Sequence, residues 1–500
     1  MRGLSRRSFL EKCGFGALAA SLVPIWSNRA EAAWADIPPG VWPPNYQPKK
    51  ILEVYCYGGM SQWENFWVSE DMATVKNWRN FQAGVQGLHW HCTATASPAD
   101  EVNSFATAPG GPPVFWGPAT KPLWRSDIFS RARMVVVAHD LQPHEAATPL
   151  NLTGHRLGNP RLAGKGAAIQ HRAMDAAPRT VPYSFVLAPD DIGPFAFGPM
   201  AAVANGMHPG FAQPMLIKIG DPTFSTLLRR SQMTTQADQL IRSYQSLYRD
   251  HMRFHGMADA IRSAGFSSYD TAVNFLLHAA DLDSLLSGGV LNVSNGRICG
   301  TDAVAEPPQV LDRTRTALAA ATLLLTSGGA RYVCIFDGGI TGPGGFFRSY
   351  DTHPDDHITV TSSNVFNVCS GLAAQIDATG TDPAKINLDD TMIVINTEFG
   401  RTPDVGVIGG RDHWPYGYAS VLIGGPISSR AIEGSVDATG ISPGAVLSPT
   451  DVHGAVLLAA GIDPFASENF GVAEFTTPLI SDGTEQGTRL NLKTKVLGVP

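Results

Sequence analysis

The feature that most constrains the fold is the alternation of short apolar runs with longer stretches of helical spacing, which is clearest in the second half of the chain. Short apolar runs bounded by Gly or polar residues are typical of buried strands. Strands that alternate with helices predict a largely parallel sheet with helices packed on its faces. The predicted strands are residues 51–57, 134–138, 215–219, 332–336, 391–396 and 419–423, and the predicted helices are residues 309–327, 358–376 and 451–460.

A block of different character lies between about residues 224 and 300. Breakers are few there up to residue 287, and leucines recur at helical spacing, which predicts an inserted helical region. No internal repeat stands out. Hydrophobic residues make up 44% of the chain, enough for a large core. We therefore expect one large α/β domain over residues 33–500, carrying the helical insertion at about 224–300.

The first 32 residues have the pattern of a targeting segment. Arg6-Arg7 is followed by Phe9-Leu10, then by a modest apolar stretch over residues 13–26 and a small-residue site at residues 30–32. These are the three regions of a signal peptide, and the paired arginines resemble a twin-arginine (Tat) export signal. The alternative is a membrane anchor, but the stretch is shorter than a span requires and contains Gly and Pro. We predict recognition by the Tat export machinery and a periplasmic or extracytoplasmic location.

Charge and cysteine content exclude several other classes. The chain has Lys+Arg 37 against Asp+Glu 44, a net charge of -7, and no block of basic residues, so no nucleic-acid partner is expected. No segment after the signal is long and apolar enough to span a membrane. Five cysteines remain after the signal, without a C-x-x-C pair, so no cysteine-based metal or redox site is predicted.

Three polar clusters stand next to predicted strands. Asp351-Thr352-His353 comes after residues 332–336, Glu398 and Arg401 follow residues 391–396, and Asp412-His413 precedes residues 419–423. His144 follows the strand at 134–138 and is expected at the same edge. Ligands of open α/β sheets bind beyond the carboxyl ends of the strands. The clusters therefore predict one site at that edge.

The side chains of these clusters suit a divalent metal. Carboxylate and imidazole groups without thiolate favour Zn, Mg, Mn or Fe, and Arg401 is suited to clamp an oxyanion of an anionic ester. The competing interpretation of each residue alone is a loop cap, a salt bridge or an ordinary histidine. Histidines without a neighbouring cluster, among them His139, His155 and His453, are given that ordinary interpretation.

The same residues carry a resemblance to a known family. The matching pieces are Gly58-Gly59-Met60-Ser61-Gln62, His144 with Thr153-Gly154, Asp351-Thr352-His353, the run Thr397-Glu398-Phe399-Gly400-Arg401-Thr402, Asp412-His413 and Gly461-Ile462-Asp463. The run from residue 397 to 402 is the most specific. Over about residues 50–464 the chain resembles the Tat-exported family called domain of unknown function 1501, which is placed in the alkaline phosphatase and sulfatase superfamily.

The resemblance implies a three-layer α/β/α sandwich with metal ions at the carboxyl edge of the sheet. It also implies hydrolysis or transfer of phosphate or sulfate esters. By position, Asp351 and His353 resemble one ligand pair, Glu398 stands for a ligand carboxylate, and His413 resembles a late ligand histidine. With His144 and Asp412, these form the predicted metal site, and Arg401 and Ser61 are the predicted catalytic residues.

The chain departs from the superfamily at three places. No carboxylate ends the first strand before Glu64, Tyr350 replaces the family's usual Trp before Asp-Thr-His, and no C-x-P-x-R sulfatase motif is present. Ser61 and Thr148 are the only candidates for a nucleophile that we single out.

Two functions follow, and a third is disfavoured. The first is an exported, metal-dependent hydrolase of phosphate or sulfate esters. The alternative is a non-catalytic exported binding or assembly protein on a degenerate alkaline-phosphatase-like fold, which the missing carboxylate and nucleophile favour. An exported redox protein is disfavoured because the chain lacks a haem motif and a dinucleotide fingerprint.

Overall fold

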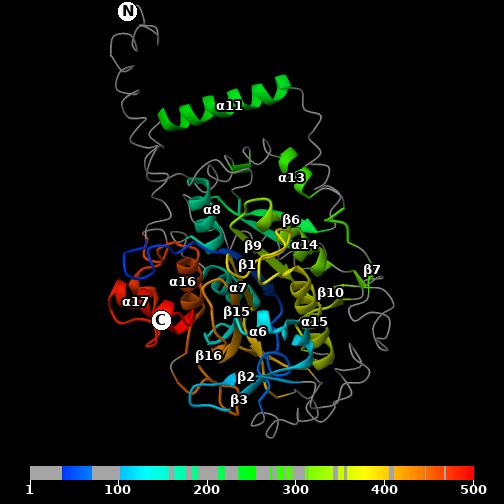
Figure 1. Cartoon of the computed structure of the whole chain (residues 1–500), viewed down its shortest axis with the longest axis vertical. Helices are drawn as coiled ribbons and strands as arrows, with labels where there is room; N and C mark the ends of the chain where they lie inside the picture. The colour runs from blue at the N-terminus through cyan, green and yellow to red at the C-terminus, as the bar shows by residue number, and fades with distance from the viewer. Residues whose placement is uncertain are drawn as a thin grey trace, which may run out of the picture.

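The structure is a computed structural model, and its elements are arranged in layers around one large sheet (Figure 1). It describes residues 37–69, 102–156, 163–175, 183–189, 212–219, 235–254, 271–272, 279–286, 289–293, 295–296, 310–311, 313–341, 347–353, 357–404, 410–444, 446–466 and 469–500. The predicted export signal lies outside these residues. Of the predicted insertion at 224–300, only parts are described, including α11 (Thr235–Phe254) and α13 (Ala279–Leu285).

Among the residues described, the central sheet has eight strands in the order β16-β4-β15-β12-β1-β9-β5-β6. Their bounds are β1 Lys50–Cys56, β4 Ala132–Val137, β5 Phe185–Pro189, β6 Met215–Ile219, β9 Tyr332–Asp337, β12 Thr391–Asn396, β15 Tyr418–Gly424 and β16 Ala431–Glu433. β1 lies between β9 and β12 and is parallel to both. β15 is antiparallel to both of its neighbours, β12 and β4. The sheet is therefore mixed but largely parallel, as predicted.

Helices cover both faces of this sheet. Successive residues of β1 point to opposite faces, so that Leu52 and Val54 enter one core while Ile51 and Tyr55 enter the other. α14 (Arg313–Thr326) and α15 (His357–Gln375) pack on the first face. α7 (His144–Thr153), α8 (Lys165–Asp175) and α16 (Pro449–Ala459) pack on the second. This arrangement confirms the three-layer α/β/α sandwich.

Shorter elements surround the sandwich. They are β2 Asn103–Thr107, β3 Pro113–Trp116, η2 Pro118–Leu123, α6 Ser126–Phe129, β7 Asn295–Gly296, β8 Val310–Leu311, β10 Ile340–Thr341, β11 Phe347–Arg348, β13 Gly400–Arg401, β14 His413–Trp414, η5 Val472–Glu474, α17 Glu485–Asn491 and η6 Leu492–Val496. Within the described ranges, no helix has the length and hydrophobicity of a membrane-spanning segment.

One expectation about local structure is corrected. The helix predicted at 309–327 begins only at Arg313, because Val310 and Leu311 form β8, and Leu311 pairs with Thr341 of β10. The helical spacing of the apolar residues does not reveal that strand partner. β15 returns antiparallel to β12, and no helix lies between them among the residues described. A parallel return would need a long crossover, usually a helix.

Candidate metal centre

The polar clusters meet at one edge of the sheet because of the direction of β15. The ends of β1, β9 and β12 lie at this edge, since the three strands are parallel. β15 runs the opposite way, so His413, which precedes it, reaches the same edge as Glu398, which follows β12. The edge therefore collects both the residues after parallel strands and those before the antiparallel one.

His144 reaches this edge as the first residue of α7. Pro143 precedes it in an extended conformation, and the helix ends where Gly154 adopts a left-handed conformation, with φ 73°. Left-handed conformations at helix ends favour Gly because it has no Cβ. A proline before the helix and a glycine after it thus set the bounds of α7 and place His144 at its start.

Three side chains converge here. One ligand atom of each of His144, Asp351 and His413 lies within 4.8 Å of the others. His353 adjoins the group, with its Nε2 at 2.9 Å from Nε2 of His413 and at 3.3 Å from Oδ1 of Asp351. Two or three imidazoles with one carboxylate match the ligand sets of zinc and other divalent metals. Four of the six predicted ligands are thus brought together.

Glu398 stands behind His144 and outside the converging group. Its Oε1 accepts hydrogen bonds from Nδ1 of His144 at 2.6 Å and from the backbone N–H of Gly58 at 2.7 Å. Nε2 of His144 is buried, has no hydrogen-bond partner, and lies 3.7 Å from Oδ2 of Asp351. In metal sites, a carboxylate commonly accepts from one histidine nitrogen while the other binds the ion. Glu398 has this geometry.

The protonation of His144 reflects its carboxylate neighbours. Burial lowers its pKa, but the carboxylates of Asp351 and Glu398 outweigh that effect and raise the pKa to about 9. Both ring nitrogens therefore carry a proton near neutral pH when no metal is bound. Because a metal ligand must be a neutral imidazole, metal binding would displace that proton.

His413 is held neutral, unlike His144. Burial, followed by the positive charges of Arg401, His144 and His353, lowers the pKa of His413 to about 4. The ring therefore offers a lone pair near neutral pH, which is the form that binds metals.

Asp412 supports His353 from the solvent side. Its Oδ1 lies 3.0 Å from Nδ1 of His353, and its side chain is 81% exposed. Asp412 thus pairs with Nδ1 of His353 at the surface, as Glu398 pairs with Nδ1 of His144 in the interior. Neither carboxylate belongs to the converging group, and their predicted roles as direct ligands stay predictions.

Arg401 lies beneath Asp351. It is fully buried, and its Nη2 donates to Oδ1 of Asp351 at 2.6 Å and also to the carbonyl of Gly58. Nε donates to the carbonyl of Gly59 at 3.1 Å, and Nη1 to that of Arg411 at 2.9 Å. Burial would raise the pKa of Asp351, yet His144 and Arg401 hold it well below its usual value. The predicted anion clamp stays untested, while the geometry favours a role in orienting Asp351.

Ser61 lies in a separate buried network. Its Oγ donates to Oε2 of Glu64 at 2.9 Å and accepts from Nη1 of Arg411 at 3.3 Å, and all three residues are almost completely buried. Thr148, the other candidate nucleophile, is also buried, within α7. The structure does not bring Ser61 into the converging group, and its catalytic role stays a prediction.

Two residues at this edge were not among the predicted site residues: His139, which was given the ordinary interpretation, and Asn151, which was not singled out. Nδ1 of His139 accepts from the N–H of Leu141, so Nε2 carries the proton and donates to the carbonyl of Glu398 at 2.7 Å. Asn151 donates to the same carbonyl at 2.8 Å. Both bonds involve backbone groups, which sequence patterns do not show. In the sequence, the feature that pointed to this edge was the position of His139 directly after the predicted strand at 134–138.

Several known proteins are similar to this chain. Among solved structures, a PsFucS1 sulfatase from Pseudoalteromonas sp. is similar, with a TM-score of 0.37, 9% identity, and coverage of 90% of this chain and 73% of that one. A protein in the alkaline phosphatase superfamily from Vibrio parahaemolyticus has a TM-score of 0.31, 10% identity, and coverage of 90% and 79%. Ps i-CgsB, solved in complex with k-i-k-neocarrahexaose, has a TM-score of 0.32, 10% identity, and coverage of 88% and 75%.

No curated protein matches the chain. A family model does match: its description is "Protein of unknown function (DUF1501)", and it spans residues 48–469. The match covers most of the 500 residues and contains every residue of the candidate metal centre. The resemblance seen in the motifs is thereby confirmed at the level of the family, and the chain belongs to DUF1501.

Proposed function

We propose that this protein is a metal-dependent hydrolase of phosphate or sulfate esters that acts after export from the cytoplasm. The observation that carries the proposal is Nε2 of His144, a buried nitrogen without a hydrogen-bond partner that faces Asp351 while Glu398 accepts from Nδ1. An unpaired buried polar atom is costly unless a ligand satisfies it. A divalent ion held by His144, Asp351 and His413 would satisfy it.

The donor set fits such an ion. His144, Asp351 and His413 would hold it, with His353 as a fourth ligand, and the nitrogen and oxygen donors suit Zn, Mn or Fe, and Mg less well. A divalent ion at such a site polarises an ester oxygen and lowers the pKa of a water molecule. This chemistry is what the motif resemblance implies for the superfamily.

The other residues hold these ligands in position. Arg401 orients Asp351, Glu398 orients His144, and His139 and Asn151 hold the backbone carbonyl of Glu398. Because Ser61 is buried and bonded to Glu64, we assign the attack to water and not to Ser61. Asp351 and His353, with side chains 39% and 37% exposed, form the face of the centre that solvent and substrate would reach.

The twin-arginine pattern at Arg6-Arg7 supports export by the Tat machinery to an extracytoplasmic location. Folding before export would let the centre acquire its metal in the cytoplasm. Cleavage near residue 32 and the presence of the mature protein in a periplasmic fraction are the expected results in an exporting cell. An uncleaved protein retained in the cytoplasm would contradict this part of the proposal.

Elemental analysis and turnover together test the proposal. Mature protein from an exporting cell, His413→Ala and His251→Ala are compared for bound metal and for hydrolysis of p-nitrophenyl phosphate and p-nitrophenyl sulfate. His251 is an exposed histidine of α11 and is the matched control. We expect a near-stoichiometric metal that falls in His413→Ala alone, with loss of hydrolysis. Turnover that survives complete metal removal would overturn the proposal.

A second candidate, a non-catalytic binding or assembly protein, is favoured by one observation. Where the first strand ends, a Cβ on Gly58 would lie 2.5 Å from the backbone N of Asp351, so no ligand carboxylate fits there without a shift of the backbone. This candidate predicts that neither ester is turned over, and Asp351→Ala would then alter metal content and stability but no catalytic rate.

A further inference from the structure

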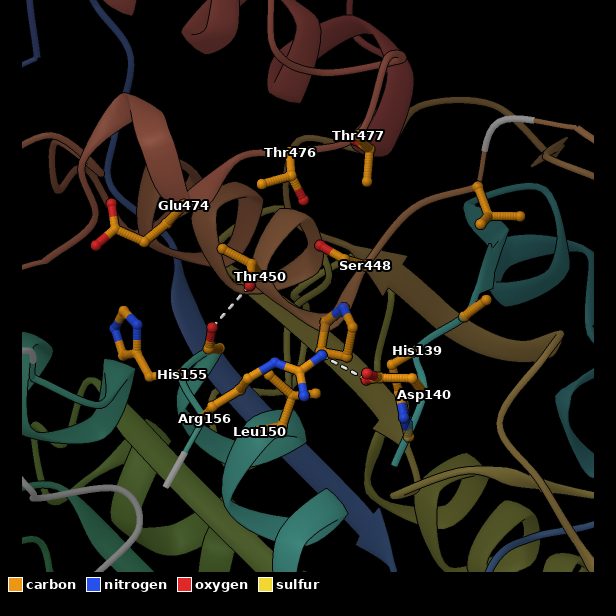
Figure 2. Close-up of a pocket in the computed structure, with 14 residues that line it drawn as sticks. His139, Asp140, Leu150, His155, Arg156, Ser448, Thr450, Glu474, Thr476 and Thr477 are labelled. Carbon is orange, nitrogen blue, oxygen red and sulfur yellow. Dashed lines mark hydrogen bonds and ion pairs between the residues drawn. The ribbon is translucent and has the colours of Figure 1, made fainter. Parts of the chain in front are cut away.

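A cavity of about 810 Å³ lies beside the candidate metal centre and takes no part in the function proposed above. The end of β4, the last turn of α7, the start of α16 and residues 474–477 surround it (Figure 2). Small-molecule sites in proteins have volumes of about 300–1,000 Å³. The cavity is therefore large enough for a ligand of one or two rings.

The hydroxyl groups of its wall offer acceptors to a ligand. Oγ of Ser448 accepts from the N–H of Asp451, and the Ser448 side chain also hydrogen-bonds to the carboxyl of Asp451. Oγ1 of Thr450 donates to the carbonyl of Gly154 at 2.7 Å, and Oγ1 of Thr477 donates to Asp451 at 3.0 Å, which leaves their lone pairs free to accept. A wall of this kind suits ligand hydroxyls, which donate and accept at the same time.

His155 adds an unsatisfied polar atom. The residue is 7% exposed and lines the cavity, and its Nε2 is buried without a hydrogen-bond partner. Burial lowers the pKa of His155 to about 4, so the ring is neutral near neutral pH. The imidazole ring of His155 packs on Phe470, with ring centroids 4.2 Å apart. A ligand hydroxyl within reach of Nε2 would remove the cost of leaving that nitrogen unpaired.

The charges around the cavity do not favour an anion. Arg156 already forms an ion pair with Asp140, and Oε2 of Glu474 accepts from the N–H of Gly471. The N-terminus of α16 has few free N–H groups for an anion, because Pro449 has no N–H and Ser448 caps the N–H of Asp451. Leu150, Val446 and Pro449 supply apolar surface. This mixture of hydroxyls and C–H surface, without a free cation among the described lining residues, fits a neutral polyol ring.

The cavity and the metal centre share two structural links. α7 begins at His144 in the centre, and Leu150 of the same helix lines the cavity, about 9 Å farther along at ~1.5 Å per residue. His139 lines the cavity as well, and its Nε2 donates to the carbonyl of Glu398. The cavity and the metal centre are therefore neighbours, and a single ring would not extend over both.

We propose that this cavity binds a neutral sugar ring of an oligosaccharide whose neighbouring unit carries the phosphate or sulfate ester placed at the metal centre. The role of the second unit rests on the proposed hydrolase function, whereas sugar binding in the cavity does not. His155 and Ser448 would contact the hydroxyls of the ring, and Leu150 and Pro449 its C–H groups.

Calorimetric titration of the mature protein tests the proposal with three neutral probes, cellobiose, lactose and maltose, and with inorganic phosphate as the anionic probe. Thr476→Trp fills the cavity from an exposed position, and Ala473→Trp adds the same side chain at an exposed position outside the lining. His155→Phe keeps the ring against Phe470 but removes Nε2. His413→Ala removes a predicted metal ligand and leaves the cavity intact.

We expect at least one disaccharide to bind with a millimolar or lower Kd. Thr476→Trp should weaken that binding at least tenfold and His155→Phe severalfold, while Ala473→Trp and His413→Ala should change it less than twofold. Binding of none of the three disaccharides, equal binding by Thr476→Trp, or phosphate binding that Thr476→Trp abolishes would each overturn the proposal. Sugar binding by a protein that holds no metal and hydrolyses neither ester would support the cavity assignment and contradict the proposed hydrolase function.

Discussion

Among single residues, the two carboxylate–histidine pairs of the metal centre differ in their exposure to solvent. Glu398 is fully buried behind His144, whereas the side chain of Asp412 behind His353 is 81% exposed. Electrostatic interactions weaken in water and in salt, so the same pairing has different strength at the two positions. The buried pair should therefore contribute most to metal affinity.

Glu398→Gln tests that difference. The amide keeps an oxygen that can accept from both His144 and Gly58, but it removes the negative charge of the carboxylate. We expect Zn affinity to fall about 10–100-fold, and the matched surface change Asp412→Asn to cost less than about threefold. Competition with a chromophoric chelator measures both. Equal losses in the two variants would show that burial of the carboxylate does not matter.

Asp451, in the first turn of α16, makes the stability of the protein depend on pH. Burial raises its pKa from 3.8 to about 6, although Ser448 and Thr477 hydrogen-bond to it. Because the folded pKa lies above the unfolded one, this carboxyl favours the folded state fully below pH ~4, and that contribution is lost as the pH rises through about 6.

Asp451→Asn removes this titration. Between pH 5 and 8 we expect the free energy of unfolding of the native protein to fall by about 1–2 kcal/mol relative to that of the variant, since one pKa unit corresponds to about 1.4 kcal/mol. Urea unfolding of both proteins at the two pH values measures the difference. A gap between the two proteins that is constant over this range would contradict the raised pKa.

At the scale of elements, the turn after β1 is packed so closely that only glycine fits. Gly58 has φ 119°, and a Cβ there would lie 2.5 Å from the backbone N of Asp351. The carbonyls of Gly58 and Gly59 also accept from Arg401, which holds Asp351. This turn therefore couples the end of the first strand to the metal ligands.

Gly58→Ala should disturb both stability and metal binding. The positive φ costs about 1–2 kcal/mol for a residue with a Cβ, and the overlap with Asp351 adds about 1–3 kcal/mol. Gly110→Ala is the control, since its φ is 65° and nothing lies within 4 Å of the added Cβ. Urea unfolding and metal content are measured for both. Retention of full metal content by Gly58→Ala would show that the turn does not position Asp351.

At the scale of the whole molecule, a buried ionic network joins β1 and β9 to two helices on one face of the sheet. Nζ of Lys165 in α8 donates to Oε1 of Glu53 at 2.7 Å, and the hydroxyl of Tyr332 donates to Oε2 at 2.6 Å. Nδ1 of His453 in α16 lies 2.8 Å from the same Nζ. Burial lowers the pKa values of Lys165 and His453, while the neighbouring Glu53 opposes that shift at Lys165.

Lys165→Met should destabilise the fold by about 3–5 kcal/mol, because Glu53 would keep a buried charge without its partner. Glu53→Gln added to Lys165→Met should recover part of that loss, since the amide oxygen can still accept from Tyr332. Asp389→Asn, in the more exposed pair with Arg131, should cost less than about 1 kcal/mol. Guanidinium unfolding compares the three variants. A double variant no more stable than Lys165→Met would contradict this account of the network.

Much of the fold could be predicted from local patterns. The predicted strands at 215–219 and 391–396 have the bounds of β6 and β12. For β12 the reason is burial of every residue in the middle of the sheet, which requires an apolar run. The helix at 358–376 differs from α15 by one residue at each end. The start of α14 was wrong by four residues, because the pairing of Leu311 with Thr341 depends on a segment far along the chain.

The candidate site was predicted in composition but not in arrangement. The sequence by itself determined which residue types reach the edge of the sheet, since carboxylates and histidines stand where the strands begin and end. Only the tertiary structure decided that Glu398 stands behind His144, that Arg401 holds Asp351, and that Ser61 is bonded to Arg411 in a separate network. The physical reason is that strand ends follow from local hydrophobic patterns, whereas these polar partners come from segments that lie 50 to 350 residues apart in the chain.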